Sequence, residues 1–239
     1  KDKETPNPNS SYLMKFFTLK LIFLLLSTSA FKVYSEEDEF VRLADKVTVD
    51  KGDSWLKATV PFVLVKHPKF ESAQKARPTS PEGAINVEYL DDVKVKLFLC
   101  FSNEYKKKLI GNRKLQDALF YQYYSAEIEY LTIKVDRTTK TANFLFPAPL
   151  AERDGFLKGG YVKLIGYAVE ISQNGVPFEM KNSISFDKYD RQDDILRKFK
   201  EQASSNADKN KGILVPAHLI DSSYFDSTAV YKRKDASAY

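Results

Sequence analysis

Apolar and polar residues alternate along most of the chain, and a period of two predicts β-strands. The clearest run extends from Trp55 to Lys66. The residues that would share one face of this half-buried strand are Leu56, Ala58, Val60, Phe62 and Leu64. Pro61 has no N–H to donate to a ladder, so we expect the strand to bulge there or to lie at a sheet edge.

Further strands are expected on both sides of this run. Their ranges are 44–51, 85–101, 123–135, 141–146, 161–172, 176–180 and 183–189. The long run 85–101 has room for two strands, with a break near residues 90–92. Gly52 and Asp53 indicate a turn, Asn174-Gly175 predicts a tight hairpin, and residues 136–140 predict a second hairpin connection.

Three segments have helical character. Residues 112–121 begin with Asn112, which can cap a helix, and residues 150–155 end in glycine. Residues 191–204 are polar apart from a narrow apolar stripe of Ile195, Leu196 and Phe199. The proline-containing segment 67–83 is expected to be a polar loop.

Seven or eight strands without regular βαβ alternation predict an all-β fold with minor helices, an antiparallel β-sandwich. We expect the sandwich to span residues 36–190 and a helical extension with a polar tail to span 191–239. Trp55 is expected to plug the core. The stripe of the extension either packs on its own sandwich or docks on another chain, and the tail beyond Asp221 is a candidate to become ordered on a partner.

The N-terminal region has the order of a secretory signal. Lys15 and Lys20 supply a short basic region, and residues 21–26 form an uninterrupted apolar run. Val33 and Ser35 then stand at positions −3 and −1 of a signal-peptidase cleavage site. We therefore expect a signal peptide over 14–35, preceded by a disordered or mis-assigned leader over 1–13. Cleavage after Ala30 and an uncleaved anchor are the alternatives. The expected location is exported: periplasmic, outer-membrane-associated or extracellular.

Charge and cysteine content narrow the function classes. The chain has 37 basic and 32 acidic residues, but residues 1–35 hold five lysines and two acidic residues, so the remainder carries a formal charge of only +2. An interspersed, near-neutral charge gives no case for nucleic-acid binding. Cys100 is the single cysteine, and its apolar neighbours predict a buried, inert thiol.

The residues typical of enzyme sites are sparse. His67 and His218 have no partner at metal-ligand spacing and are expected at the surface, so no metal or cofactor is expected. The S-x-x-K match at Ser72 stands in a proline-flanked loop and is interpreted as coincidence. Glu127 and Glu129 alternate with apolar residues, which predicts a solvated face with cross-strand Glu–Lys pairs rather than a catalytic carboxylate pair.

Aromatic residues are the main candidates for a binding surface. The candidates are Tyr121, Tyr123, Tyr124, Tyr224, Phe225 and Tyr231. Exposed tyrosines suit sugar stacking or a protein interface, whereas the alternative for residues 120–124 is packing at the edge of the core.

The segments YYSAEIEYLTIKVDRTTKTANFLFPAPLAERDG, from Tyr123 to Gly155, and YVKLIGYAVEISQNGVPF, from Tyr161 to Phe178, resemble a known group of proteins. They are similar to secreted immunoglobulin-like β-sandwich proteins encoded beside type IV pilus genes in some bacteria, over roughly residues 45–220. The resemblance implies an envelope-associated, non-enzymatic role and carries over no functional residue. The paired cysteines and mid-strand tryptophan of antibody domains are absent.

The sequence thus favours a non-catalytic exported protein of the cell envelope that acts as a binding or assembly module, with a pilus association as one form of it. Its partner would be an envelope protein or a second copy of itself, with no nucleic acid and no membrane span after signal cleavage. The alternatives are a carbohydrate-binding module that uses the tyrosines and a secreted hydrolase.

Overall fold

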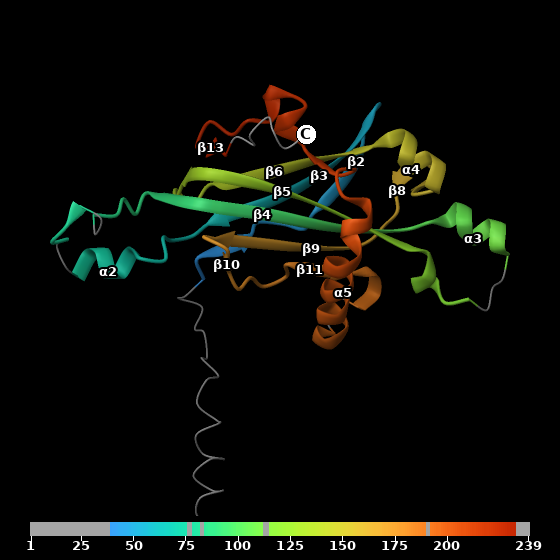
Figure 1. The fold of residues 1–239 in the computed structure, drawn as a ribbon, viewed down its shortest axis with the longest axis horizontal. Coiled ribbons are helices and arrows are strands. Elements are labelled where there is room, and N and C mark those ends of the chain that lie inside the picture. The colour runs from blue at the N-terminus through green and yellow to red at the C-terminus, as the bar shows by residue number, and fades with distance from the viewer. Residues whose placement is uncertain (1–38, 76–77, 82–83, 112–114, 190–191, 233–239) are drawn as a thin grey trace, which may run out of the picture. The chain divides into compact units, whose positions relative to one another are not determined.

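In the computed structural model, the described part of the chain is organised around two antiparallel sheets (Figure 1). The structure describes residues 39–232 except 76–77, 82–83, 112–114 and 190–191. The expected leader over 1–13 and signal peptide over 14–35 lie outside the described residues, as does Asn112.

The first sheet has the strand order β1-β3-β6-β12, and β2 also pairs with β3. Its strands are β1 (Val41–Leu43), β2 (Thr48–Lys51), β3 (Trp55–Leu64), β6 (Thr139–Pro147) and β12 (Val215–Pro216). The Gly52-Asp53 turn between β2 and β3 is confirmed, because the Gly52 amide donates to the carbonyl of Trp55 across 2.9 Å.

The second sheet has the order β10-β9-β4-β5-β13, and β11 also pairs with β9. Its strands are β4 (Tyr89–Ser102), β5 (Tyr121–Lys134), β9 (Leu164–Gln173), β10 (Val176–Pro177), β11 (Ile184–Phe186) and β13 (Ala229–Tyr231). A separate ribbon joins β7 (Leu157–Lys158) to β8 (Tyr161–Val162). The Asn174-Gly175 hairpin is confirmed between β9 and β10. The run 85–101 contains one long strand, β4, rather than two.

Short helices connect the strands. The α-helices are α2 (Phe70–Lys75), α3 (Glu104–Ile110), α4 (Ala148–Asp154) and α5 (Asp193–Asn206). The 3-10 segments are η3 (Asp117–Phe120), η4 (Asp187–Tyr189), η5 (Ala207–Asn210), η6 (Ala217–Leu219) and η7 (Ser222–Tyr224). The helix expected over 112–121 is wrong: the α-helix begins eight residues earlier, capped by Asn103, and only η3 falls in the expected range.

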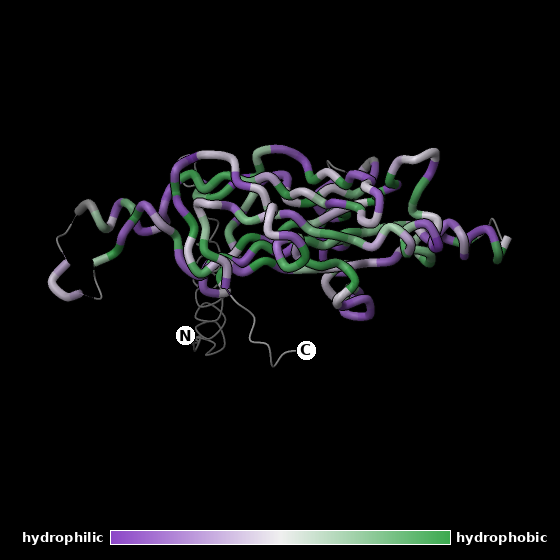
Figure 2. The backbone as a smooth tube through the Cα atoms, turned by 90° about the horizontal axis from the view of Figure 1, so that it is seen from above, coloured by the Kyte–Doolittle hydropathy of each residue, from purple (hydrophilic) through white to green (hydrophobic). Residues whose placement is uncertain are grey.

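The main core lies between the two sheets, and Figure 2 shows apolar segments concentrated along their strands. The predicted face of β3 is confirmed, since Leu56, Ala58, Val60, Phe62 and Leu64 are all at most 1% exposed. Trp55 alternates out of this row and is only half-buried, so it does not plug the core as expected.

Aromatic side chains fill one end of this core. Phe101 of β4 stacks on Phe156, with ring centroids 4.8 Å apart, and Tyr124 of β5 meets Phe146 edge-on at 4.8 Å. Burial of each such side chain contributes about 1.5–3 kcal/mol. The ends of β4 and β5 are therefore firmly held where the chain leaves the second sheet.

Pro61 lies at neither a bulge nor a sheet edge. Its pairing with Thr141 of β6 continues the β3–β6 ladder without a shift. On the other side, β1 pairs with residues 62–64 and β2 with residues 56–59, so Pro61 faces the interval between two partner strands. Its missing N–H therefore disrupts no ladder, because no strand residue stands opposite to accept it.

Residues 136–140 do not close a hairpin, contrary to the sequence prediction. β5 pairs with β4 and β13 in the second sheet, whereas β6 pairs with β3 and β12 in the first, so this connection crosses between sheets. Lys140 is buried at this crossing with 3% exposure. Its Nζ donates to Asp136 across 3.0 Å, to Thr138 across 3.0 Å and to Thr228 across 2.8 Å.

The helical extension packs on its own sandwich, as one of the two expected arrangements requires. α5 covers the outer face of the second sheet through Phe199, which is 2% exposed. A Cβ at Gly166 of β9 would lie 3.0 Å from Phe199 Cζ and 2.6 Å from the Ser185 carbonyl oxygen, so only glycine allows this approach. Cys100 is fully buried beneath the helix, which confirms its predicted burial.

The predicted polar tail is part of the fold up to residue 232. β13 pairs with β5 from Ile133 to Tyr130, and the rings of Tyr130 and Tyr231 lie 4.8 Å apart. β12 likewise adds to the first sheet beside β6. Residues 191–232 therefore complete both sheets and do not form an appendage to a finished domain.

We predict that deletion of residues 222–239 lowers the free energy of unfolding by about 3 kcal/mol, because it removes Tyr231 from Tyr130 and Thr228 from Lys140. Urea unfolding of the full chain and the truncation measures the difference. Deletion of residues 233–239 alone is the control and should leave the midpoint unchanged. An unchanged midpoint in the longer deletion would show that β13 is dispensable.

Acid should weaken the crossing between the sheets. Partial burial opposes ionisation of Asp136, but hydrogen bonds from Thr138 and Lys140 outweigh it and lower its pKa from 3.8 to about 2. Because the folded pKa is depressed, the stabilisation is complete above pH 4 and is lost as the pH falls towards 2. It amounts to about 2 kcal/mol. Asp136→Asn should lose this pH-dependent part, so the difference in unfolding free energy between the two proteins should shrink in acid.

Candidate binding surface

A long connection between two paired strands is the most unusual local feature. Ser102 of β4 and Tyr121 of β5 stand directly opposite each other, so a turn of about 2–5 residues would suffice to join the strands. Instead residues 103–120 intervene and carry α3 and η3. We call the described residues of this connection, 103–111 and 115–120, the projection, and Figure 1 shows α3 beyond the ends of β4 and β5.

Hydrogen bonds at the base of the projection fix where α3 starts. The Asn103 amide donates to the Phe120 carbonyl across 2.9 Å and closes the base. The Asn103 side chain accepts from the Lys106 amide across 2.8 Å, which satisfies one of the free donors of the first helical turn. Asn103 and Phe120 are both buried. The base therefore belongs to the folded body.

Ion pairs hold the polar side of α3 against its surroundings. Glu104 accepts from Lys163, between β8 and β9, across 2.9 Å, and Lys107 pairs with Asp117 of η3. Partial burial opposes ionisation of Glu104, but the hydrogen bond from Lys163 outweighs it and lowers its pKa. The hydrogen bond from Lys107 likewise lowers the pKa of Asp117. These carboxylates stay charged and orient the helix.

The apolar side of α3 points to solvent. Tyr105 is 54% exposed, Leu109 68% and Ile110 55%, and α3 has no buried residue. Leu119 of η3 is 68% exposed as well, and Leu115 lies between the two helices with 36% exposure. A helix at a protein surface ordinarily turns its apolar side inward, so the amphipathic arrangement of α3 is inverted. Apolar residues gathered in this way mark a contact surface.

Unpaired lysines lie beside these apolar side chains. Lys106 and Lys108 have no carboxylate partner among the described residues, and both are exposed. The described residues of the projection include three basic and two acidic residues, a net charge of +1. A depression of about 400 Å³ lies beside Lys108 and is lined by α3, α4 and β7. The projection therefore combines exposed apolar groups with excess positive charge.

The outer face of the second sheet carries a ladder of ion pairs, as the sequence predicts. Lys94 lies 3.2 Å from Glu127 and 3.1 Å from Glu129, and Lys200 of α5 lies 2.9 Å from Glu170. The hydrogen bond from Lys94 lowers the pKa of Glu129. A general acid needs a raised pKa, so these charges do not suit the acid of a glycoside hydrolase.

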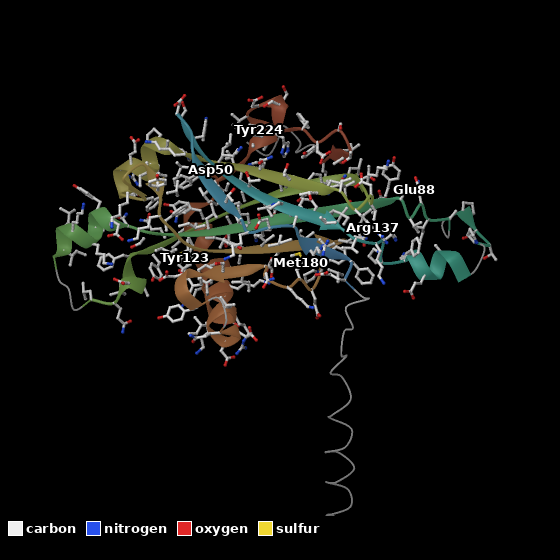
Figure 3. The ribbon with its side chains drawn as sticks, turned by 180° about the vertical axis from the view of Figure 1, so that it is seen from behind. Asp50, Glu88, Tyr123, Arg137, Met180 and Tyr224 are labelled. Atoms are coloured by element: carbon white, nitrogen blue, oxygen red, sulfur yellow. The ribbon has the colours of Figure 1, made fainter. Side chains whose placement is uncertain are left out.

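The tyrosines of residues 120–124 form no exposed row of rings. Tyr124 is 2% exposed in the core, which makes core packing the correct alternative for it. Tyr123 is covered by α5 and donates to Gln202 across 3.3 Å (Figure 3). Tyr121 is half-buried, edge-on to Phe186 at 5.9 Å. Both faces of this strand end are covered, so the rings have structural contacts.

The aromatic residues of the tail form a cluster with His218. The ring of Tyr231 lies 4.3 Å from His218 and 5.0 Å from Phe225. Tyr231 thus anchors the tail, whereas Phe225 remains 53% exposed. Tyr224 instead borders a depression of about 400 Å³ that Trp55 also lines.

This second depression has the mixed chemistry of a small polar site. Its remaining lining comes from the β2–β3 turn, β6 and the segment after η6: Asp50, Lys51, Gly52, Asp53, Ser54, Lys57, Leu145, Ile220 and Asp221. Asp50 and Tyr224 appear on the same side of the molecule in Figure 3. Trp55 is therefore placed where a ligand could reach it.

His67 and Ser72 occupy other environments than the sequence predicts, whereas His218 is half-buried beside Tyr231. His67 is buried with 5% exposure, and its Nδ1 accepts from the Lys69 amide across 3.0 Å. Burial, and to a lesser degree Lys69, lowers its pKa. Ser72 lies on α2 rather than in a loop, and it is exposed at the surface instead of buried at an active site.

The comparisons with known proteins add no relative. No protein-family model, no curated protein and no solved structure matches this chain. None of the described helices has the length and hydropathy needed to cross a bilayer. In the described ranges, no three His, Cys, Asp or Glu side chains gather as a ligand set for a metal ion.

Sequence reasoning missed the projection. The run of three lysines followed by Leu109 and Ile110 is visible in the sequence, and Asn103 stands one residue before Glu104 as a capping signal. A helix start at Asn112 places the predicted helix eight residues after the true start of α3, so the basic and apolar residues 106–110 fall outside the predicted helix.

Proposed function

We propose that this chain is an exported, non-catalytic binding or assembly module of the bacterial cell envelope, and that the projection is its contact surface. The inverted arrangement of α3 carries this proposal. Glu104 and Lys107 are held in ion pairs with Lys163 and Asp117, while Leu109 and Ile110 on the same helix are exposed. Solvation of these side chains is costly, and a binding partner would remove that cost.

We infer that the sandwich is immunoglobulin-like. The pairing of β2, β3 and β6 follows the A-B-E order of that fold, and the pairing of β4, β9 and β10 follows the C-F-G order. β5 then corresponds to an added strand beside C. β12 takes the position of strand D, although it comes from the C-terminal region. This order supports the resemblance to secreted immunoglobulin-like proteins of pilus gene clusters, and with it the proposed envelope role.

Export is proposed from the order of residues 14–35, with a periplasmic, outer-membrane-associated or extracellular location.

The non-catalytic assignment is supported by the chemistry of the candidate nucleophile and acids. Burial raises the pKa of Cys100 to about 12, which leaves no thiolate at neutral pH. The hydrogen bond from Lys94 lowers the pKa of Glu129 on the second sheet, which does not suit a general acid. A secreted hydrolase is thus the weaker alternative.

We predict that the triple substitution Leu109→Ser, Ile110→Ser and Leu119→Ser lowers retention of the chain in the cell-envelope fraction by about tenfold or more, because it removes the apolar contacts of the projection. Fractionation and immunoblotting of expressing cells measure retention. The melting temperature should stay unchanged, since none of the three side chains is buried.

A matched triple variant controls for surface hydrophobicity in general. Leu131, Val176 and Val230 are similarly exposed, at 52%, 68% and 52%. They lie near the end of the second sheet opposite the projection, because Val230 pairs with Thr132, and Val176 pairs with Gln173, which pairs with Val93. Their replacement by serine should leave retention unchanged. Equal retention in all three proteins would contradict the assignment of the projection as the contact surface.

Carbohydrate binding is the second candidate function, now at the depression lined by Trp55 and Tyr224. Aromatic rings beside carboxylates and amines are groups that recognise sugars by stacking and hydrogen bonding. The buried rings of Tyr123 and Tyr124 do not serve this function, so the candidate rests on Trp55 instead.

If the depression binds glycans, cell-wall oligosaccharides should shift the fluorescence of Trp55, which is the single tryptophan in the chain and reports without labelling. Tyr224→Ala should weaken the response about tenfold, because stacking on an aromatic ring is lost. The Leu131→Ser, Val176→Ser and Val230→Ser variant is the control. An unchanged spectrum across envelope glycans removes this candidate.

A further inference from the structure

We propose that the projection inserts its apolar side chains into the surface of an anionic lipid bilayer, so that the module is held at a membrane face without spanning it. This inference rests on the proposed function, in which the projection is the contact surface. It adds the chemical class of the partner. Four observations support it: the outward apolar side chains, their unpaired lysines, the dimensions of the helix, and its fixed orientation.

The apolar side chains stand on a convex end of the fold. Tyr105, Leu109 and Ile110 occupy the side of α3 opposite its ion pairs, and Leu119 extends this surface onto η3. Charged residues supply six of the nine lining residues of the neighbouring depression, and Tyr105 and Leu157 form its apolar part. Apolar side chains that point away from the protein can be buried in a lipid bilayer, because the lipids rearrange around inserted groups.

The charge of the projection complements an anionic surface. The described residues of the projection carry three lysines and two carboxylates, a net charge of +1. Lys106 and Lys108 have no carboxylate partner among the described residues. Lysines beside apolar side chains can extend their amines to lipid phosphates while their methylene groups lie against the acyl region.

The dimensions fit an interfacial position. α3 has seven residues, about 10 Å of helix, and can lie parallel to the membrane plane with its apolar side in the headgroup region. The ion pair of Glu104 with Lys163 and that of Lys107 with Asp117 hold the helix so that its apolar side leads. The tip therefore enters in one orientation without first having to fold.

A second copy of the chain is the less favourable occupant. Contact between two projections would bring Lys106 and Lys108 of both copies together, and like charges repel across an interface. Contact with the ladder on the second sheet would meet carboxylates that Lys94 and Lys200 already neutralise. Acidic lipid headgroups have no such competing partners.

Vesicle co-sedimentation tests the proposal with the chain beginning at Glu36. This form lacks the apolar segment 14–35, and it retains the whole compact unit from Glu39 to Tyr239. The vesicles contain phosphatidylcholine alone or phosphatidylcholine with a third of phosphatidylglycerol. We expect at least about tenfold stronger binding to the anionic vesicles, and each of Lys106→Gln and Lys108→Gln should weaken that binding about fivefold.

The triple serine variant of Leu109, Ile110 and Leu119 should bind at least about thirtyfold more weakly, and the matched variant of Leu131, Val176 and Val230 should bind like the parent. A Leu109→Trp substitution in a Trp55→Phe background should show a blue-shifted emission with anionic vesicles only. Thermal unfolding of each variant shows that it is folded before the vesicle measurement.

The outcomes separate this inference from the proposed function. If the parent binds no vesicle but the triple serine variant still loses envelope retention, the partner is a protein or glycan and only the membrane inference falls. If vesicle binding survives the triple substitution, another surface meets the lipid and the inference also falls. If the triple variant behaves like the parent in both assays, both proposals are wrong.

Discussion

Burial of β4 on both faces is the constraint on which the other parts of the structure depend. Its alternate residues Val95, Leu97 and Leu99 are fully buried between the two sheets. On the opposite face Phe98 and Cys100 are covered by α5. A strand in this position needs partners on both edges and a cover on its outer side, so β5, β9 and α5 are required together. The projection starts where this doubly buried strand ends, and it therefore has a rigid base.

Features governed by neighbouring residues could be predicted from the sequence. The alternation in β3 was predicted correctly because only one of its faces is buried, and Asn174-Gly175 fixed its hairpin through local backbone geometry. The crossing at residues 136–140 was not predictable in this way. Turn residues favour a reversal of the chain, but which sheet receives β6 is decided by its pairing with the distant β3. The position of Pro61 depends equally on where β1 ends and β2 begins.

The candidate surface was harder to predict for a related reason. Tyrosines on both faces of β5 suggested exposed rings, since a solvated outer face is common in antiparallel sheets. α5 covers that face at Tyr123, and a helix far along the chain leaves no sign near residue 123. Conversely, Leu109 and Ile110 are residues that ordinarily enter a core. The orientation of α3 involves the ion pair of Glu104 with Lys163, a residue 59 positions along the chain, which no short window of sequence contains.

The late strands β12 and β13 have a consequence for how the chain reaches its native state. Each completes one of the two sheets, and each pairs with a strand that is synthesised roughly seventy to a hundred residues earlier. Until residues 215–231 are available, β6 and β5 present unpaired edges, and such edges favour association with other chains. Folding that proceeds from the N-terminus during synthesis would therefore pause at an incomplete intermediate that tends to associate with other chains. A chain that folds only after its last strands are available avoids this hazard.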